Sequence, residues 1–165
     1  MLLLKRLVFA LPAPLHRGLF RVAHAARKAL WKWRKPRVEG VRVLACDAQG
    51  RIILVRHSYG SDAWMPSGGG LSRGEDPLVA AARELREETG CRLCGARLVA
   101  VTAEDLHGAS NVVYIVAGTT RDTPVPDGRE IVAAKAFALD VLPTPMPKGL
   151  AAKIALWLDE RPLVD

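Results

Sequence analysis

Three glutamates in the middle of the chain have the spacing that brings carboxylates together on one face of a helix. Glu84, Glu87 and Glu88 stand at positions i, i+3 and i+4, which are neighbours on a helix surface. Clustered carboxylates suit hard divalent cations, and Mg²⁺ takes one or two of them while keeping waters and substrate phosphate oxygens. The alternative is a solvated acidic face, since most runs of like charge only face water.

A glycine-rich segment directly precedes these glutamates. Residues 69–76 read Gly-Gly-Leu-Ser-Arg-Gly-Glu-Asp, which predicts a loop. Glycine lets the backbone come close to a ligand because it carries no side chain. A loop of this kind followed by an acidic helix indicates a metal-assisted phosphate site.

The helix that carries the glutamates has clear start and stop signals. Asp76 can cap the free N–H groups and Pro77 suits the first helical position. Gly90 can end the helix in a left-handed conformation. The helix is therefore predicted over about residues 77–89. Its apolar side should pack on the body of the protein through Leu78, Ala81, Ala82 and Leu85.

The stretch from Gly69 to Cys91 resembles the Nudix box, Gly-x5-Glu-x7-Arg-Glu-U-x-Glu-Glu-x-Gly-U, where U is a bulky aliphatic residue. Eight positions match at the required spacing: Gly69, Glu75, Arg83, Glu84, Leu85, Glu87, Glu88 and Gly90. Cys91 departs from the pattern at the last U position, where a small apolar residue should bury acceptably. The resemblance covers about residues 38–160.

A second departure lies just before the box. The family often has Trp-x-x-Pro-Gly-Gly, whereas this chain reads Trp-Met-Pro-Ser-Gly-Gly over residues 64–69. Ser67 is interpreted as a one-residue insertion or a register change, which affects the geometry of the loop before the box.

The resemblance implies a hydrolase that cleaves the diphosphate bond of a nucleoside diphosphate linked to another moiety. It implies Mg²⁺ or Mn²⁺ as the cofactor, which positions the diphosphate and activates a water. The implied metal ligands are Glu84, Glu87 and Glu88, with Glu75 either holding the groups around the metal in place or acting as an auxiliary ligand.

Further roles follow from the same resemblance. Arg83 is expected to orient the carboxylates by ion pairs, and Gly69 and Gly70 to let the loop approach metal and substrate. Glu84 is a candidate base, but the general base in relatives varies and can come from a later loop. Glu130 is the candidate there, with Asp127 behind it, and plain exposed loop acids are the alternative.

Two other functions stay open. A Nudix-fold binding or regulatory protein without turnover usually loses carboxylates from the box, and this chain keeps all of them. An RNA-end pyrophosphohydrolase would use a basic segment to hold the RNA, which predicts steep salt dependence of binding.

The positive charge of the chain belongs to its first 37 residues. The formal net charge is +7, yet residues 1–37 carry ten Lys and Arg and no acid, and the remainder carries 14 basic and 17 acidic residues. The body of the protein is therefore mildly acidic, with a net charge of −3 from these counts. A whole-chain argument for nucleic-acid binding is weak on this basis, and nucleic acid is not an expected partner.

Residues 1–37 are expected to form a separate basic amphipathic segment ahead of the main domain, with a helix over residues 15–33. Apolar residues recur at positions 15, 19, 22, 26, 30 and 33, with basic residues between them. Such a helix can lie on an anionic membrane surface. The alternative is a helix packed on the domain or on a second subunit of a homodimer, and an Arg-rich leader also fits an organellar transit peptide. The expected location is the cytoplasm, with or without attachment to a membrane surface.

The remaining segments predict the elements that position the box. Residues 41–46 and 51–56 read as an opening hairpin, and residues 96–103, 111–118 and 135–139 as further strands, with 111–118 central. Residues 148–159 fit a closing helix. With the resemblance, this implies one α/β domain over residues 38–165, a Nudix fold whose mixed β-sheet is sandwiched between helices (α/β/α).

Two aromatic residues and three cysteines complete the set of reactive side chains. His57 and Tyr59 follow the second strand, where they could reach a ligand or be plain surface groups. The cysteines at positions 46, 91 and 94 have no second Cys-x-x-Cys pair, so they are interpreted as structural thiols rather than zinc ligands.

Overall fold

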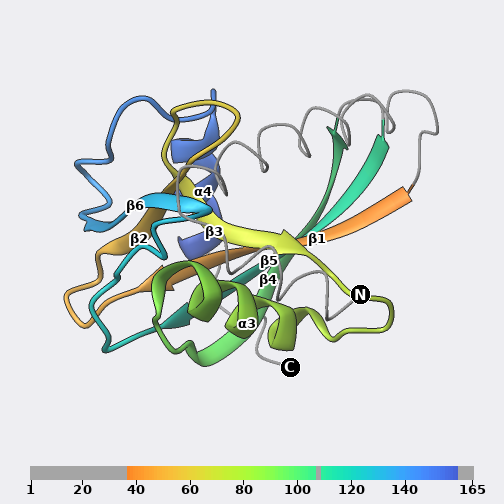
Figure 1. The fold of residues 1–165 in the computed structure, drawn as a ribbon, viewed down its shortest axis with the longest axis horizontal. Helices are drawn as coiled ribbons and strands as arrows, with labels where there is room; N and C mark the ends of the chain where they lie inside the picture. Colours follow the sequence, from red (N-terminus) through yellow and green to blue (C-terminus); the bar gives the residue numbers. More distant parts are fainter. Residues whose placement is uncertain (1–36, 107–108, 160–165) are drawn as a thin grey trace.

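One mixed sheet organises the part of the chain that the structure describes. A computed structural model describes residues 37–106 and 109–159. The strands lie in the order β4-β5-β1-β3-β2-β6, in which β1 and β5 are parallel and the other pairs are antiparallel (Figure 1). The strands are β1 (Arg37–Cys46), β2 (Ile52–His57), β3 (Met65–Gly70), β4 (Cys94–Leu106), β5 (Ala109–Thr119) and β6 (Ile131–Phe137). The helices are α3 (Pro77–Thr89) and α4 (Leu150–Asp159).

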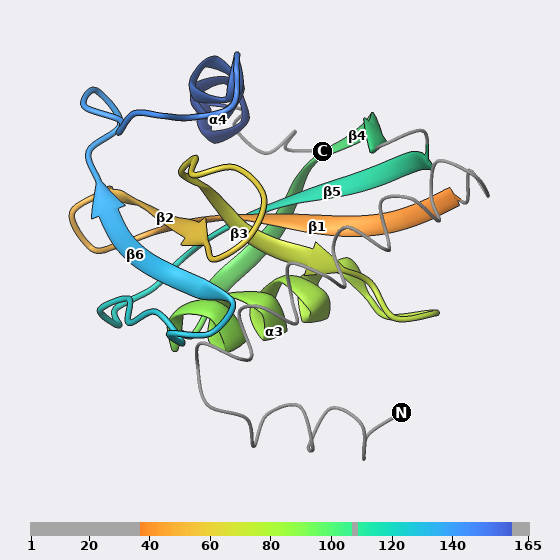
Figure 2. The same ribbon diagram turned by 45° about the horizontal axis from the view of Figure 1, so that its top comes forward.

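The two helices cover opposite faces of the sheet, as Figure 2 shows. Alternation along β1 explains this arrangement, because successive side chains of a strand point to opposite faces. Val41, Val43 and Ala45 belong to the apolar cluster that includes the buried side of α3. Leu44 belongs to the cluster that includes α4. The predicted α/β/α sandwich is therefore confirmed for the described residues.

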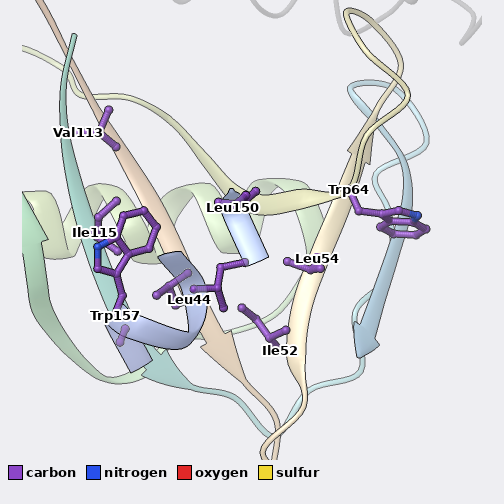
Figure 3. Packing of buried hydrophobic residues seen from close by; sticks show 10 residues of the cluster. Leu44, Ile52, Leu54, Trp64, Val113, Ile115, Leu150 and Trp157 are labelled. Atoms are coloured by element: carbon purple, nitrogen blue, oxygen red, sulfur yellow. The ribbon is translucent and has the colours of Figure 1, made fainter. Parts of the chain in front are cut away.

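The larger apolar cluster lies between the sheet and α4. Leu150, Ile154 and Trp157 of α4 are buried against the sheet. Figure 3 shows Trp157 beside Ile115 of β5, with Leu44 of β1 nearby. This apolar face leaves the opposite face of the sheet to α3 and its carboxylates.

Several sequence expectations are confirmed. The structure places α3 over Pro77–Thr89, as the cap signals predict. The strand expected at 111–118 is β5, an interior strand between β4 and β1. The closing helix is α4, which starts two residues later than expected.

The largest error of the sequence interpretation concerns the segment that forms β3. Residues 69 and 70 were expected in a loop because glycine-rich segments predict loops. They end a strand instead, in which Gly68, Gly69 and Gly70 pair with Arg42, Val41 and Gly40 of β1. Backbone hydrogen bonds to a neighbouring strand override the low strand propensity of glycine here.

Two further corrections follow from the same sheet. Because β3 also pairs with β2, the expected opening hairpin pairs only at Cys46 and Ile52. The strand expected to end near Ala103 continues to Leu106, since its partner β5 begins at Ala109.

The predicted amphipathic helix within residues 1–37 lies outside the described residues, apart from Arg37 at the start of β1. Among the helices of residues 37–106 and 109–159, none is long and apolar enough to cross a membrane.

Candidate active site

The caps of α3 fix where its side chains point. The Asp76 carboxylate accepts hydrogen bonds from the N–H groups of Leu78 and Val79, at 2.7 and 3.4 Å. At the other end Gly90 takes φ of 73° and its N–H donates to the Arg86 carbonyl. Ala80, Ala81 and Leu85 bury one side of the helix under the sheet. The remaining faces carry Arg83 and the three glutamates.

Arg83 joins the helix to the segment that precedes it. Its guanidinium donates to both carboxylate oxygens of Glu75, at 2.9 and 3.0 Å, and to the Gly70 carbonyl at 3.2 Å. It also donates to Glu84 at 2.6 Å, and lies 3.6 Å from a Glu87 oxygen. A planar guanidinium suits this arrangement because its donors form a rigid fork. Arg83 therefore holds two carboxylates and the end of β3 together.

These contacts shift the pKa values of Glu75 and Arg83. The hydrogen bonds from Arg83, and then that from the Ser72 N–H, lower the pKa of Glu75 to about 2. The hydrogen bond to Glu75 is also the main reason that the pKa of Arg83 is raised. Glu84 behaves differently, because burial is the largest influence on its carboxyl and raises its pKa despite the hydrogen bond and charge of Arg83, and the nearby charges of Glu88 and Glu87 raise it further.

Gly69 makes room for the Glu84 carboxylate. A Cβ atom at this position would lie 2.5 Å from Glu84 Oε1 and 2.6 Å from Cδ, far inside van der Waals contact. A residue with a side chain would therefore push Glu84 away from β3. This gives a steric reason for the first glycine of the box, in addition to the close approach of a ligand.

Glu88 is the buried carboxylate of the set. Its side chain is 6% exposed, and one oxygen accepts from the Ser67 hydroxyl at 2.6 Å and from the Gly68 N–H at 3.2 Å. Its other oxygen lies 3.5 Å from His57 Nε2. Buried carboxylates are costly unless they are hydrogen-bonded, so these donors explain how Glu88 is tolerated inside the fold.

Ser67 is a strand residue rather than an insertion. The pairing of β3 with β1 runs without a register shift from Ser67 opposite Val43 to Gly70 opposite Gly40. The expected insertion or register change is therefore wrong. Ser67 is fully buried and its hydroxyl points to Glu88, which is a role that a proline at this position could not fill.

Glu130 reaches the same side of the sheet from a distant part of the chain. Its carboxylate accepts a hydrogen bond from the Tyr59 hydroxyl at 2.5 Å, and the Tyr59 ring lies 5.3 Å from the His57 ring. Since His57 contacts Glu88, these side chains connect the box to the loop before β6. Asp127 instead accepts hydrogen bonds from three backbone N–H groups, those of residues 129, 130 and 131.

The carboxylates of the box have the chemistry of ligands for a divalent cation. The box offers carboxylate oxygens, which are the ligands that Mg²⁺ and Mn²⁺ prefer. In residues 37–106 and 109–159, no three side chains of His, Cys, Asp or Glu are already placed together to hold a metal. Glu87 is exposed and could turn, whereas Glu75, Glu84 and Glu88 are engaged with protein donors.

Comparison with known families agrees with this geometry. The family model of the NUDIX domain matches residues 36–158, about three quarters of the chain. The chain belongs to this family.

Individual Nudix relatives resemble parts of the chain. An RNA pyrophosphohydrolase of Rhodospirillum rubrum is 39% identical over 57 residues, which are 34% of this chain and 34% of that protein. The alignment thus spans about a third of the length of this curated relative. A MutT Nudix hydrolase structure from Burkholderia pseudomallei has a TM-score of 0.64 at 24% identity, covering 72% of this chain and 96% of the other, and supports the fold alone. A structure of a UDP-X diphosphatase has a TM-score of 0.62 at 26% identity, covering 74% of this chain and 61% of that one.

Three residues near the Nudix box were not assigned a role from the sequence, or were left undecided. Ser67 and His57 both contact Glu88, and Tyr59 holds Glu130. For His57 the plain surface interpretation is wrong, since its side chain is 13% exposed. A signal was present, because strand alternation from the buried Ile53 places His57 on the face that α3 covers.

The Glu75–Arg83 pair leads to a pH-dependent prediction of stability. The pKa of Glu75 is depressed, so its stabilising effect is present above the unfolded pKa of about 4.3 and is lost as the pH falls toward about 2. Partial exposure should limit the effect to about 1 kcal/mol. We expect Glu75→Gln to lower the melting temperature at pH 6, and this difference to disappear as the pH falls from about 4.5 to 2.

Thermal melts of both proteins between pH 2 and pH 7 measure this effect. Glu39→Gln, which neutralises an exposed carboxylate on β1, is the control and should not show the same pH dependence. A difference between wild type and Glu75→Gln that persists at pH 2 would contradict the assignment to this ion pair.

Proposed function

We propose that this protein is a divalent-metal-dependent hydrolase of the diphosphate bond in a nucleoside diphosphate linked to another moiety. The observation that carries the proposal is the set of contacts that Arg83 makes with the carboxylates of the box. One guanidinium holds Glu75 and Glu84 at hydrogen-bond distance and lies beside Glu87. Such an arrangement is expected where carboxylates must be kept charged and oriented, and a structural helix face would not need it.

The reaction is substitution at phosphorus by water. It therefore needs positive charge that neutralises the phosphate oxygens, and an activated water. When bound, Mg²⁺ or Mn²⁺ supplies Lewis acidity and lowers the pKa of a water ligand. Glu84, Glu87 and Glu88 would hold the ion, with Glu75 as an auxiliary ligand. Gly69 and Gly70 leave the end of β3 open to the substrate.

The chain's own residues provide orientation and a base. Arg83 keeps Glu75 ionised and fixes the direction of Glu84. We assign the general base to Glu130, whose carboxylate is held by Tyr59 on the same side of the sheet as the box. Asp127 fits this role less well, because its oxygens already bind the backbone of its own loop.

A second candidate substrate is the 5′ end of an RNA. Several relatives that match about a third of this chain are named RNA pyrophosphohydrolase, including those of Rhodospirillum rubrum and Pectobacterium atrosepticum. This similarity weakens the expectation that nucleic acid is not a partner. The cleaved bond is again a diphosphate linkage, so the same residues would serve both substrates.

A substrate panel tests both candidates. Wild-type protein is incubated with nucleoside diphosphate derivatives and with a 5′-triphosphorylated RNA oligonucleotide, with Mg²⁺ or Mn²⁺, and released phosphate and nucleotide are measured. Turnover of a small nucleotide with little salt dependence supports the first candidate. Turnover of RNA with KM rising steeply with salt supports the second, since phosphate contacts release counterions. No turnover of any substrate by folded protein would favour a Nudix-fold binding protein.

A further inference from the structure

The two carboxylate oxygens of Glu88 have different surroundings. Oε2 accepts hydrogen bonds from the Ser67 hydroxyl at 2.6 Å and from the Gly68 N–H at 3.2 Å. Oε1 lies 3.5 Å from His57 Nε2, which is longer than an ordinary N–H···O hydrogen bond. Strand β3 therefore holds one oxygen of this carboxylate, and the other oxygen can still bind a ligand.

The two donors leave the Glu88 side chain little freedom to turn. The Gly68 N–H belongs to the backbone of β3, and Ser67 is fully buried in the same strand. A hydrogen bond from a hydroxyl to an ionised carboxylate is stronger than one between neutral groups. If the carboxylate turned Oε2 toward a ligand, the buried Ser67 hydroxyl would lose its acceptor, which is unfavourable.

This arrangement depends on the residue that the chain has at position 67. Ser67 stands where the Nudix pattern often has the proline of Trp-x-x-Pro-Gly-Gly. Proline has neither a hydroxyl nor a backbone N–H, so it could not donate to a carboxylate. The Gly68 N–H would be available with either residue, whereas the Ser67 hydroxyl is an additional donor of this chain.

The number of oxygens that a carboxylate offers influences which divalent cation it prefers. Mg²⁺ requires near-octahedral geometry with short metal–oxygen distances of about 2.0–2.1 Å. Mn²⁺ is likewise bound by octahedral sets of oxygen ligands. Ca²⁺ is larger, with metal–oxygen distances of about 2.3–2.6 Å, and can take both oxygens of one carboxylate. A carboxylate that can offer only one oxygen therefore favours Mg²⁺ or Mn²⁺ over Ca²⁺.

We propose that Ser67 is a positioning residue that sets the ion preference of the candidate site, because it restricts Glu88 to a single oxygen, Oε1, for the metal. The inference rests on the proposed function, since it needs Glu88 as a metal ligand. It deepens that function by assigning selectivity for Mg²⁺ or Mn²⁺ over Ca²⁺ to one hydroxyl. Ser67 acts through Glu88 and does not itself contact the ion.

Two substitutions at position 67 test this role. Ser67→Ala removes the hydroxyl. Ser67→Cys replaces it with a thiol, which is a weak donor of similar size, and remains informative if the alanine variant does not fold. Thr89→Val is the matched control, because it also removes a buried hydroxyl. That hydroxyl donates to the Leu85 carbonyl at 2.6 Å and not to Glu88.

Two dissociation constants are measured for each full-length protein, below its melting temperature and without substrate. The Kd of Mn²⁺ comes from electron paramagnetic resonance, and the Kd of Ca²⁺ from calorimetry. Both Ser67 variants should bind Mn²⁺ roughly 10- to 100-fold more weakly than wild type, which is typical when a partner of a metal ligand is removed. Their Ca²⁺ affinity should change by no more than about threefold, because the freed Oε2 lets Glu88 offer both oxygens.

The ratio of the two dissociation constants distinguishes positioning from a purely structural role. Wild type and Thr89→Val should prefer Mn²⁺, and the folded Ser67 variants should lose most of that preference. An equal loss of affinity for both ions, an unchanged Mn²⁺ affinity in the Ser67 variants, or no preference for Mn²⁺ in wild type would overturn the proposal.

These measurements need no turnover, so they separate the role of Ser67 from the proposed hydrolysis. A selective loss of Mn²⁺ affinity in the Ser67 variants, without turnover of any substrate by wild type, would count against the hydrolase and support the role of Ser67. Turnover that depends on Glu87, with the same ion preference in wild type and the Ser67 variants, would support the hydrolase and overturn the role of Ser67.

Discussion

Replacing Glu87 by glutamine is expected to lower kcat by at least about 100-fold while leaving the fold intact. The side chain is 60% exposed and makes no core contact, so its loss should change the free energy of unfolding by no more than about 0.5 kcal/mol. Its carboxylate is the proposed metal ligand with the fewest protein partners. Glutamine removes one negative charge from that site, and each 1.36 kcal/mol lost from transition-state stabilisation lowers the rate tenfold.

Two quantities are measured for wild type and Glu87→Gln: kcat on the best substrate of the panel, and Mn²⁺ affinity by electron paramagnetic resonance. Both should fall in Glu87→Gln, with the melting temperature unchanged within about 2 °C. Asp159→Asn on α4 removes an exposed carboxylate from the opposite side of the sheet and should change neither. Near-wild-type turnover of Glu87→Gln with Mg²⁺ would refute the metal role of this carboxylate.

The parts of the site that lie within one helix could be predicted from the sequence. Asp76, Pro77 and Gly90 determine the ends of α3 through local hydrogen bonds and backbone preferences. The spacing of Arg83 and the glutamates then follows from the geometry of the helix, without knowledge of the rest of the fold. These signals are local, so no tertiary contact is needed to interpret them.

The strand β3 could not be predicted in the same way. Glycine, serine and proline have little tendency to form strands, and what makes residues 65–70 a strand is their position between β1 and β2. The partners in β1 are distant in sequence. The partners in β2 could not be identified because the sequence pattern indicated that β2 pairs with β1 as a hairpin. The error on Ser67 has the same origin, since its role appears only when Glu88 is placed beside it.

The convergence of the loop residues on the box is also a property of the sheet. Tyr59 and Glu130 are 71 positions apart, and they meet because β2 and β6 are neighbours. The sequence named both residues as candidates without relating them to each other. Long-range pairing of strands therefore brings Glu130, the candidate general base, and the Tyr59 side chain to the same site.

The largest effect on stability is expected from Gly68→Ala. A Cβ atom at Gly68 would lie 2.1 Å from the Val41 carbonyl oxygen and 3.1 Å from Arg42 Cα, and both are backbone atoms of β1. Backbone cannot turn away as a side chain can, so β1 and β3 would have to separate. We expect destabilisation of about 3 kcal/mol or more, at the upper end of overpacking costs, and a melting temperature lower by at least about 6 °C.

Gly70→Ala is the matched control, since it makes the same change two residues along the same strand. There a Cβ atom would meet only the Glu39 carbonyl oxygen, at 3.9 Å, which is an ordinary contact. Thermal and urea unfolding of both variants should therefore show a large loss for Gly68→Ala and a change within about 0.5 kcal/mol for Gly70→Ala. Similar stability of the two variants would show that β1 and β3 do not approach as closely as the pairing of Gly68 with Arg42 requires. The Ser67 and Gly68 donors to Glu88 depend on that approach, so the same result would also remove the structural reason for a buried carboxylate at this position.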